Sequence, residues 1–270
     1  MTAPWAWRWA AYALVAAISV YLVAPMAIIV VISFSDSALL TFPPPGLSLR
    51  WYRSLAETPA WRDSILVSLQ VMVLTAVAAT ALGTAAALGL ASWRGPLAAT
   101  IRSLLMAPLV IPHIISGAAI FLLFDAWGWV GSLQALVLGH IALAVPYVVA
   151  TVGAALETMD HRLTQAALTL GASPRIAFMR VTLPLIRPGI LAGLLFAAML
   201  SFDELIVSLF LSTPQLRTVT VLMWSNVLGD IDPEISAIAT VILLVSMVLL
   251  ALQWFLSRQR GVPVLQGIGR

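Results

Sequence analysis

Six long apolar stretches decide what this chain can fold into. They cover residues 9–34, 64–93, 101–124, 133–156, 188–212 and 234–256. Each reaches or exceeds the roughly 20 residues that a helix needs to cross the hydrocarbon core of a bilayer. Because backbone N–H and C=O groups in hydrocarbon must bond within their own segment, each stretch is predicted to be helical. The sequence therefore predicts an all-α integral membrane protein with six transmembrane helices.

The composition supports this prediction and excludes several other classes of protein. Of the 270 residues, 61% are hydrophobic and only 9% are charged, whereas an ordinary soluble domain has about 25% charged residues. The chain has no cysteine, which excludes disulfides, thiol catalysis and cysteine metal sites. Its arginines are scattered over the loops, so nucleic acid is not a predicted partner.

The first stretch could be mistaken for a signal peptide, because Arg8 precedes an apolar run. The run is longer than the hydrophobic region of about 7–15 residues in such peptides, so we expect a retained first span. Ten arginines then lie on the side of the N-terminus: Arg8, Arg94, Arg102, Arg162, Arg175, Arg180, Arg187, Arg258, Arg260 and Arg270. Four lie on the other side: Arg50, Arg53, Arg62 and Arg217. The positive-inside rule therefore predicts that both termini are cytoplasmic.

Small residues mark one stripe of the second stretch. Gly83 and Ala87 stand four apart, as do Ala76, Thr80 and Thr84. Such stripes let helix backbones approach closely. The stripe predicts packing in the bundle interior or against another subunit, and ordinary tight packing within the chain remains an equal alternative.

Two shorter segments are not predicted to span. In the first outer loop, three successive prolines at 43–45 predict extended chain, and residues 49–60 suit a short interfacial helix. Residues 219–227 are apolar but too short to cross, which favours a re-entrant or interfacial piece.

The segment 157–187 is far longer than a connector between neighbouring spans requires. A first helix is expected over 162–170, ending at Gly171 as a C-terminal cap. Ser173 suits the N-cap of a second helix over 175–181.

Pro184 and Pro188 are expected to break the chain before the fifth span. The two short helices would form an exposed protrusion with an apolar and basic surface, on which a partner protein could dock. An amphipathic loop lying on the lipid surface is the alternative.

This segment resembles the EAA loop of ABC importer permeases. The residues that carry the resemblance are Gln165, Ala166, Ala167, Gly171, Val181, Leu183 and Pro184. The resemblance implies that the loop inserts into a cleft of a cytoplasmic ATPase subunit and transmits closure of the ATPase dimer to the membrane helices. Gln165 stands where the family usually has Glu, so a charged contact would become a neutral hydrogen bond, weaker by about 1 kcal/mol.

Other segments are similar to the shorter permease subunit of spermidine/putrescine importers. They are residues 33–37, 42–52, 107–112, 139–148, 200–208 and 232–246. The resemblance implies a type I importer fold forming one permease domain over 1–270 in a bacterial inner membrane. It also implies a second permease chain, two ATPase subunits and a periplasmic binding protein. ATP and Mg²⁺ would belong to the ATPase, and no cofactor is expected in this chain.

Asp203 and Glu204 fall in the middle of the fifth stretch. A carboxylate at the bilayer centre costs at least about 2.5–3.5 kcal/mol on insertion scales, so it indicates a water-filled path, a buried cation or a cationic substrate. Neighbouring helical side chains point about 100° apart, so one carboxylate can face the path while the other packs. We predict that they line the route of a polyamine, with a structural lock to the second permease chain as the alternative.

The histidines and the outer acidic residues carry weaker signals. His113 stands where similar polyamine permeases often have an acidic residue, which weakens the cation-selective prediction. His140 is predicted to hydrogen-bond between helices rather than bind a ligand, and no metal site is predicted. The outer acidic residues Asp230, Asp232 and Glu234 could be solvated, bind the periplasmic protein or attract a cation.

Three classes of function are open to a membrane chain of this composition. An ABC permease working by alternating access is favoured, and its cargo could instead be an aminophosphonate, another amine, sulfate or ferric iron. An ion-coupled secondary transporter would usually show two matching halves, which are not visible. A membrane enzyme is not supported, because no catalytic constellation is recognisable. The sequence has no Walker A motif, so the energy must come from another subunit.

Overall fold

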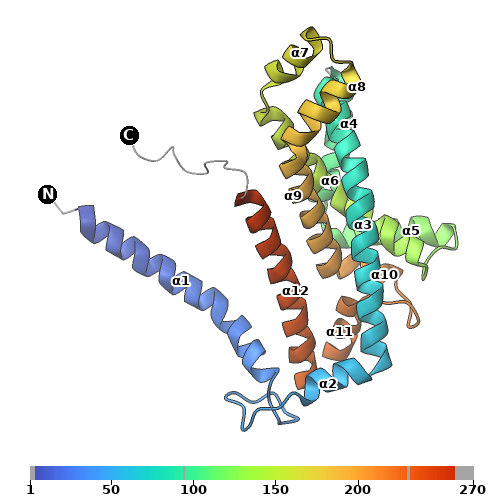
Figure 1. Cartoon of the computed structure of the whole chain (residues 1–270). Helices are drawn as coiled ribbons and strands as arrows, with labels where there is room; N and C mark the ends of the chain where they lie inside the picture. The colour runs from blue at the N-terminus through green and yellow to red at the C-terminus, as the bar shows by residue number, and fades with distance from the viewer. Residues whose placement is uncertain (1–3, 94, 230–231, 259–270) are drawn as a thin grey trace. The chain divides into compact units, whose positions relative to one another are not determined.

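A computed structural model describes residues 4–93, 95–229 and 232–258, and the regular elements of these residues are helices (Figure 1). In chain order they are α1 Pro4–Ile32, α2 Arg50–Glu57, α3 Pro59–Ser92, α4 Pro96–Met106, η1 Ala107–Leu109, α5 His113–Ala126, α6 Leu133–Thr158, α7 His161–Thr169, α8 Pro174–Ala177, η2 Phe178–Thr182, α9 Leu183–Asp203, α10 Ile206–Leu211, α11 Val219–Val227 and α12 Pro233–Arg258.

Within these residues, five helical segments are long and apolar enough to cross a membrane. They are Trp7–Ile32, Pro59–Ser92, Leu133–Thr158, Pro174–Asp203 and Pro233–Leu256. A sixth candidate is the pair Pro96–Leu109 and His113–Ala126, which is bent by 105°. The all-α prediction is confirmed, with five to six candidate spans.

Two of the expected spans differ from the prediction. The stretch 101–124 is not one helix, because Pro108 and Pro112 lie at the turn between α4 and α5 and each lacks a backbone N–H. The stretch 188–212 is also interrupted. Helix α9 ends at Asp203, and a separate short helix, α10, begins at Ile206.

The chain divides into two compact units. Unit 1 comprises Met1–Arg62 and Met223–Val245, and unit 2 comprises Asp63–Leu222 and Ser246–Arg270. Each unit is described separately below. That the whole chain acts as one permease domain stays a prediction.

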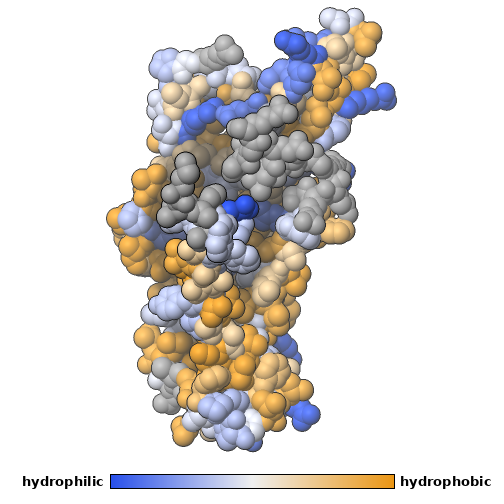
Figure 2. Space-filling view, turned by 90° about the vertical axis from the view of Figure 1, so that its left-hand side faces the viewer, coloured by the Kyte–Doolittle hydropathy of each residue, from blue (hydrophilic) through white to orange (hydrophobic). Residues whose placement is uncertain are grey.

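Unit 1 contains α1, whose apolar spanning segment is exposed along nearly its whole length and buries only Ile32 at its end. Figure 2 shows apolar residues, in orange, across much of the face turned to the viewer. An apolar helix that is exposed all round requires lipid or another chain to cover it. The loop after α1 is not helical at Pro43–Pro45 and is followed by α2, as predicted. The hydroxyls of Ser33 and Tyr52 lie 2.7 Å apart and tie the end of α1 to α2.

Unit 2 is built around α6 and α9, which lie side by side (Figure 1). Small and β-branched residues fill this contact, including the fully buried Ala144, Val148, Val152, Ile186 and Ala197. Helix α3 adds its small-residue stripe, and a Cβ at Gly83 would come 2.6 Å from Val148 Cβ. Tight packing within the chain is thus confirmed for Gly83.

The segment 157–187 forms the expected helical hairpin. Asp160 caps α7, Gly171 ends it with φ +88°, and Ser173 caps α8. The predicted break at the two prolines was wrong, because α8, the π-helical turn η2 and α9 follow one another without an interruption.

The positions of the two prolines explain this continuity. Pro184 falls in the first turn of α9, where a missing N–H is tolerated. Pro188 lies inside α9, and such prolines are tolerated in membrane helices where neighbouring groups satisfy the freed carbonyl.

Candidate functional site

A cavity of about 530 Å³ in unit 2 brings together residues from four helices, α5, α6, α9 and α10, at the α9–α10 break. His113 comes from the start of α5, Tyr147 from α6 and Asp203 from the last position of α9. Its apolar lining includes Phe196, Met199, Leu200, Leu205 and Ile206. All three predicted path residues, His113, Asp203 and Glu204, therefore line one cavity, and its role as the path stays a prediction. Tyr147 was not predicted, although it lies in the conspicuous segment 139–148.

The two neighbouring acids have different surroundings. Asp203 is exposed, whereas Glu204 is 5% exposed. The Glu204 carboxylate accepts the backbone N–H of Val207 on Oε1 and that of Ser208 on Oε2, both at 3.0 Å. A carboxylate that accepts the first free N–H groups of a helix stabilises that helix end. The Asp203 side chain is thus the more exposed of the two acids, although both border the cavity; which of them faces a transport path stays a prediction.

His140 is fully buried on α6 and hydrogen-bonds to both helices that flank the break. Its Nδ1 lies 2.8 Å from Ser201 Oγ, and its Nε2 lies 2.9 Å from Ser208 Oγ. A serine hydroxyl can donate or accept, so a neutral imidazole satisfies both bonds. The same Nε2 is 3.7 Å from Glu204 Oε2. The predicted interhelical role of His140 is confirmed.

The backbone at the break is also satisfied. The Thr220 hydroxyl donates to the carbonyl oxygen of Glu204 at 3.0 Å. Thr220 in turn lies 2.9 Å from Thr218 Oγ1, and Ser68 Oγ of α3 accepts the N–H of Val219 at 2.8 Å. Because both the side chain and the carbonyl of Glu204 have partners, the break between α9 and α10 is held on both sides.

The EAA-like residues are spread over one hairpin. Gln165, Ala166 and Ala167 lie on α7, Val181 on η2, and Leu183 and Pro184 open α9, while Gly171 forms the turn. Gln165 is exposed. Large apolar side chains of the same hairpin are exposed as well, among them Leu163, Leu170, Ile176 and Met179. The exposed Arg162, Arg175 and Arg180 make the same surface basic.

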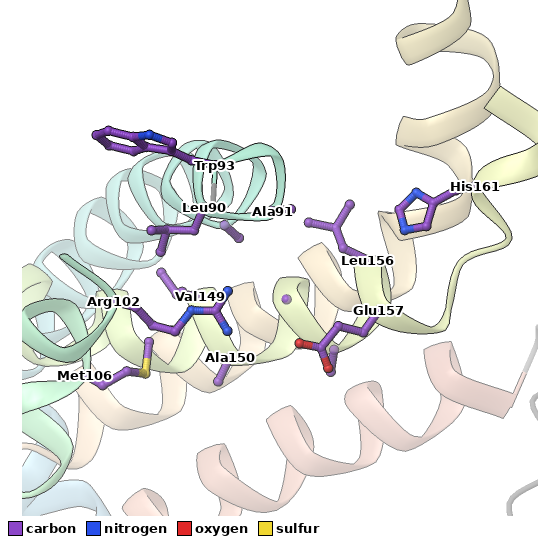
Figure 3. Close-up of a pocket in the computed structure, with 13 residues that line it drawn as sticks. Leu90, Ala91, Trp93, Arg102, Met106, Val149, Ala150, Leu156, Glu157 and His161 are labelled. Atoms are coloured by element: carbon purple, nitrogen blue, oxygen red, sulfur yellow. The ribbon is translucent and has the colours of Figure 1, made fainter. Parts of the chain in front are cut away.

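A second cavity of about 440 Å³ lies where α7 leaves α6 (Figure 3). Arg102 of α4 and Glu157 of α6 extend into it, with His161 at the start of α7. Leu90 and Trp93 lie at its α3 wall. The base of the hairpin thus adjoins a largely apolar cavity that also holds three polar side chains, those of Arg102, Glu157 and His161.

The remaining predicted polar residues fall elsewhere. Asp232 lies in unit 1, where its carboxylate accepts the N–H of Glu234 at 3.0 Å at the start of α12. Asp230, Arg94, Arg260 and Arg270 lie outside the described residues.

These features define a multi-pass helical membrane protein in which an exposed hairpin continues into a spanning helix that ends at an acidic cavity. The chain belongs to the family of inner-membrane components of binding-protein-dependent transport systems, whose family model matches residues 79–260. It is thus a membrane-spanning ABC transporter permease, as the EAA-like residues predict.

Curated relatives cover nearly the whole chain. It is 36% identical over 259 residues to the putrescine transport system permease protein PotI of Escherichia coli K12, covering 93% of this chain and 91% of PotI. It is 29% identical over 244 residues to the spermidine/putrescine transport system permease protein PotC of the same strain, covering 90% and 92%. The molybdenum transport system permease protein ModB of Mycobacterium bovis is 32% identical over 181 residues, covering 61% and 69%.

Solved structures confirm the fold. A chain of a bacterial ABC transporter involved in alginate import aligns with a TM-score of 0.70 at 14% identity, covering 93% of this chain and 94% of that one. A chain of an amino acid ABC transporter aligns with a TM-score of 0.61 at 18% identity, covering 78% and 98%. The type I permease fold predicted from the resemblance is therefore present.

Proposed function

We propose that this chain forms part of the import path for a polyamine, with Asp203 as the carboxylate that meets the cationic cargo. The observation that carries the proposal is the cavity at the α9–α10 break, where the exposed Asp203 lies beside Tyr147 and apolar side chains. A polyamine alternates ammonium groups with methylene chains, so a carboxylate, an aromatic ring and an apolar wall suit it.

The relatives support this choice of cargo. The names of PotI and PotC give putrescine and spermidine as their substrates, and the likeness to both extends over most of this chain. ModB, which is named for molybdenum transport, is matched over a shorter part. His113 is the feature that favours a different cargo, because it places an imidazole where a second carboxylate would serve a cation better.

The energy for import would come from partner subunits. We propose a second permease chain, two ATPase subunits that bind ATP and Mg²⁺, and a periplasmic binding protein that delivers the cargo. In this arrangement both termini and the 157–187 hairpin are cytoplasmic. The exposed apolar and basic surface around Gln165 suits insertion into an ATPase cleft. We assign no ATP hydrolysis to this chain.

The continuous helix from the hairpin to the cavity suggests how movement of the ATPase subunits is transmitted to the cargo site. The segment Pro174–Asp203 has 30 residues, which corresponds to about 45 Å of helix. It begins in the hairpin and ends at the cavity, so movement of the hairpin displaces Asp203 directly. Closure of the ATPase dimer would in this way drive alternating access.

The proposal is tested by transport in proteoliposomes that contain the assembled complex, with labelled putrescine and spermidine delivered by the binding protein. Asp203→Asn is expected to lower uptake at least about tenfold, the factor for losing one charged contact. Asp125→Asn is the matched control, because Asp125 is an exposed carboxylate on α5 that does not line this cavity. Full uptake by Asp203→Asn would refute the path assignment.

Competition experiments test the identity of the cargo independently of the assignment of the chain to an importer. Unlabelled putrescine should compete with labelled spermidine, whereas sulfate, molybdate and an aminophosphonate should not. If one of these competitors were taken up in an ATP-dependent manner in place of polyamines, the assignment as an importer would stand and the assignment of a polyamine cargo would be wrong.

A further inference from the structure

Glu204 borders the cavity, but its carboxylate and the imidazole of the buried His140 already make hydrogen bonds within the chain. His140 is 0% exposed and Glu204 is 5% exposed. Both oxygens of the carboxylate accept backbone N–H groups of α10, and both ring nitrogens of His140 are within 2.9 Å of a serine hydroxyl. Side chains whose polar atoms are already occupied in this way fix the position of the backbone that carries them.

The backbone that they fix carries Asp203. Ser201 lies two residues before Asp203, and Ser208 lies five residues after it on the other side of the break. His140 bridges these two serines from α6, and Glu204 holds the first turn of α10. Without these bonds, the N–H groups of Val207 and Ser208 could bond within a helix that continues from α9. Continuing the helix would abolish the break.

We infer that Glu204, His140, Ser201 and Ser208 are positioning residues, which hold the α9–α10 break open so that the Asp203 carboxylate faces the cavity. This inference rests on the proposed function only for the role of Asp203 in transport. The geometric part, that the network sets the exposure of position 203, can be tested by itself.

The chain has no native cysteine, so a single Asp203→Cys substitution gives a reporter at this position. In the assembled complex, an amine-bearing methanethiosulfonate reagent is applied, and the labelling rate of this chain is followed by mass spectrometry. Adding Glu204→Gln replaces one acceptor oxygen with a donor group. It is expected to slow labelling at position 203 about tenfold, as for one lost charge-assisted hydrogen bond.

Two comparisons separate positioning from general damage. Ser201→Ala is a milder variant that removes only the hydroxyl partner of Nδ1, and it should slow labelling in the same direction. Its matched control is Ser92→Ala, since the Ser92 hydroxyl bonds only to backbone carbonyls of its own helix and the residue is exposed. A reporter at Asp125→Cys should label at the same rate with or without Glu204→Gln.

The outcomes distinguish the two ideas. If position 203 labels equally fast with Glu204→Gln and with Ser201→Ala in an intact complex, the positioning role is overturned. If both variants slow labelling but Asp203→Asn imports putrescine at the full rate, the positioning role stands and the proposed contact between Asp203 and the cargo fails. Slower labelling together with reduced uptake by Asp203→Asn supports both.

Discussion

The hydroxyls of Thr164 and Thr182 lie 3.2 Å apart and join α7 to the π-helical turn η2. Thr182 is buried, and its bond is made between two elements of the hairpin rather than within one. The hairpin is therefore fastened to the base of α9 by a side-chain bond in addition to the chain itself.

Thr182→Val should loosen this connection while keeping the shape of the side chain. The loss of one hydrogen bond is expected to cost about 1 kcal/mol and to raise the number of ATP molecules hydrolysed per cargo imported. Thr100→Val is the control, because the Thr100 hydroxyl bonds only to the Pro96 carbonyl in its own helix. An unchanged ratio of hydrolysis to uptake would show that the bond plays no part in coupling.

Gly189→Ala should destabilise the contact between α9 and α6. An added Cβ would come 2.6 Å from Ala155 Cβ and 2.9 Å from the Thr151 carbonyl oxygen, so backbone must shift. Overpacking of this kind costs about 1–3 kcal/mol, and the thermal unfolding midpoint of the purified complex should fall.

Gly153→Ala on α6 is the matched control for that experiment. A Cβ there would meet nothing within 4 Å, and alanine is favoured over glycine in a helix by about 1 kcal/mol. The midpoint should stay the same or rise. A fall equal to that of Gly189→Ala would contradict the packing explanation.

Gly171→Ala should strain the turn of the hairpin. Gly171 has φ +88° with open space around it, so the cost comes from the backbone alone and amounts to about 1–2 kcal/mol. We expect weaker retention of the ATPase subunits during purification. Gly89→Ala, which also faces open space but lies within α3, should retain them normally.

Gln165→Glu should strengthen docking of the ATPase subunit. The side chain is exposed on α7, and replacing a neutral hydrogen bond by a charged one adds about 1 kcal/mol, or roughly fivefold in Kd. The change is measured by titrating the ATPase onto the permease pair in nanodiscs. Weaker binding would mean that the cleft is adapted to the neutral amide.

Much of the fold could be predicted because hydrophobic length alone identifies spanning helices. The ends of α6 and α12 lie within two residues of the predicted ends. The 105° bend between α4 and α5 was missed, although the segment 107–112 contains two prolines that signalled it. Proline marks where a helix can end, but tertiary packing decides whether it does, as the unbroken start of α9 shows.

The candidate site was predicted only in part. A pair of acids in an apolar stretch pointed to Asp203 and Glu204, but spacing could not tell the exposed acid from the helix cap. That distinction depends on where α9 ends, and the N–H groups of α10 become available only because it ends there. Tyr147 joins the cavity through the packing of α6 on α9, which has no local sequence signal.

The π-helical turn η2 also affects the rotation of the hairpin about the helix axis relative to Asp203. A π turn holds one residue more than the α-helical turn it replaces, and one residue corresponds to about 100° of rotation along a helix. Deleting the extra residue within Phe178–Thr182 would therefore restore an α-helical turn and keep the hairpin in phase with Asp203, whereas deleting one residue from the α-helical part of α9 would turn the hairpin by about 100° relative to Asp203. The turn fixes the direction in which the hairpin faces when Asp203 faces the cavity, so a partner that docks on the hairpin meets a particular side of the helix.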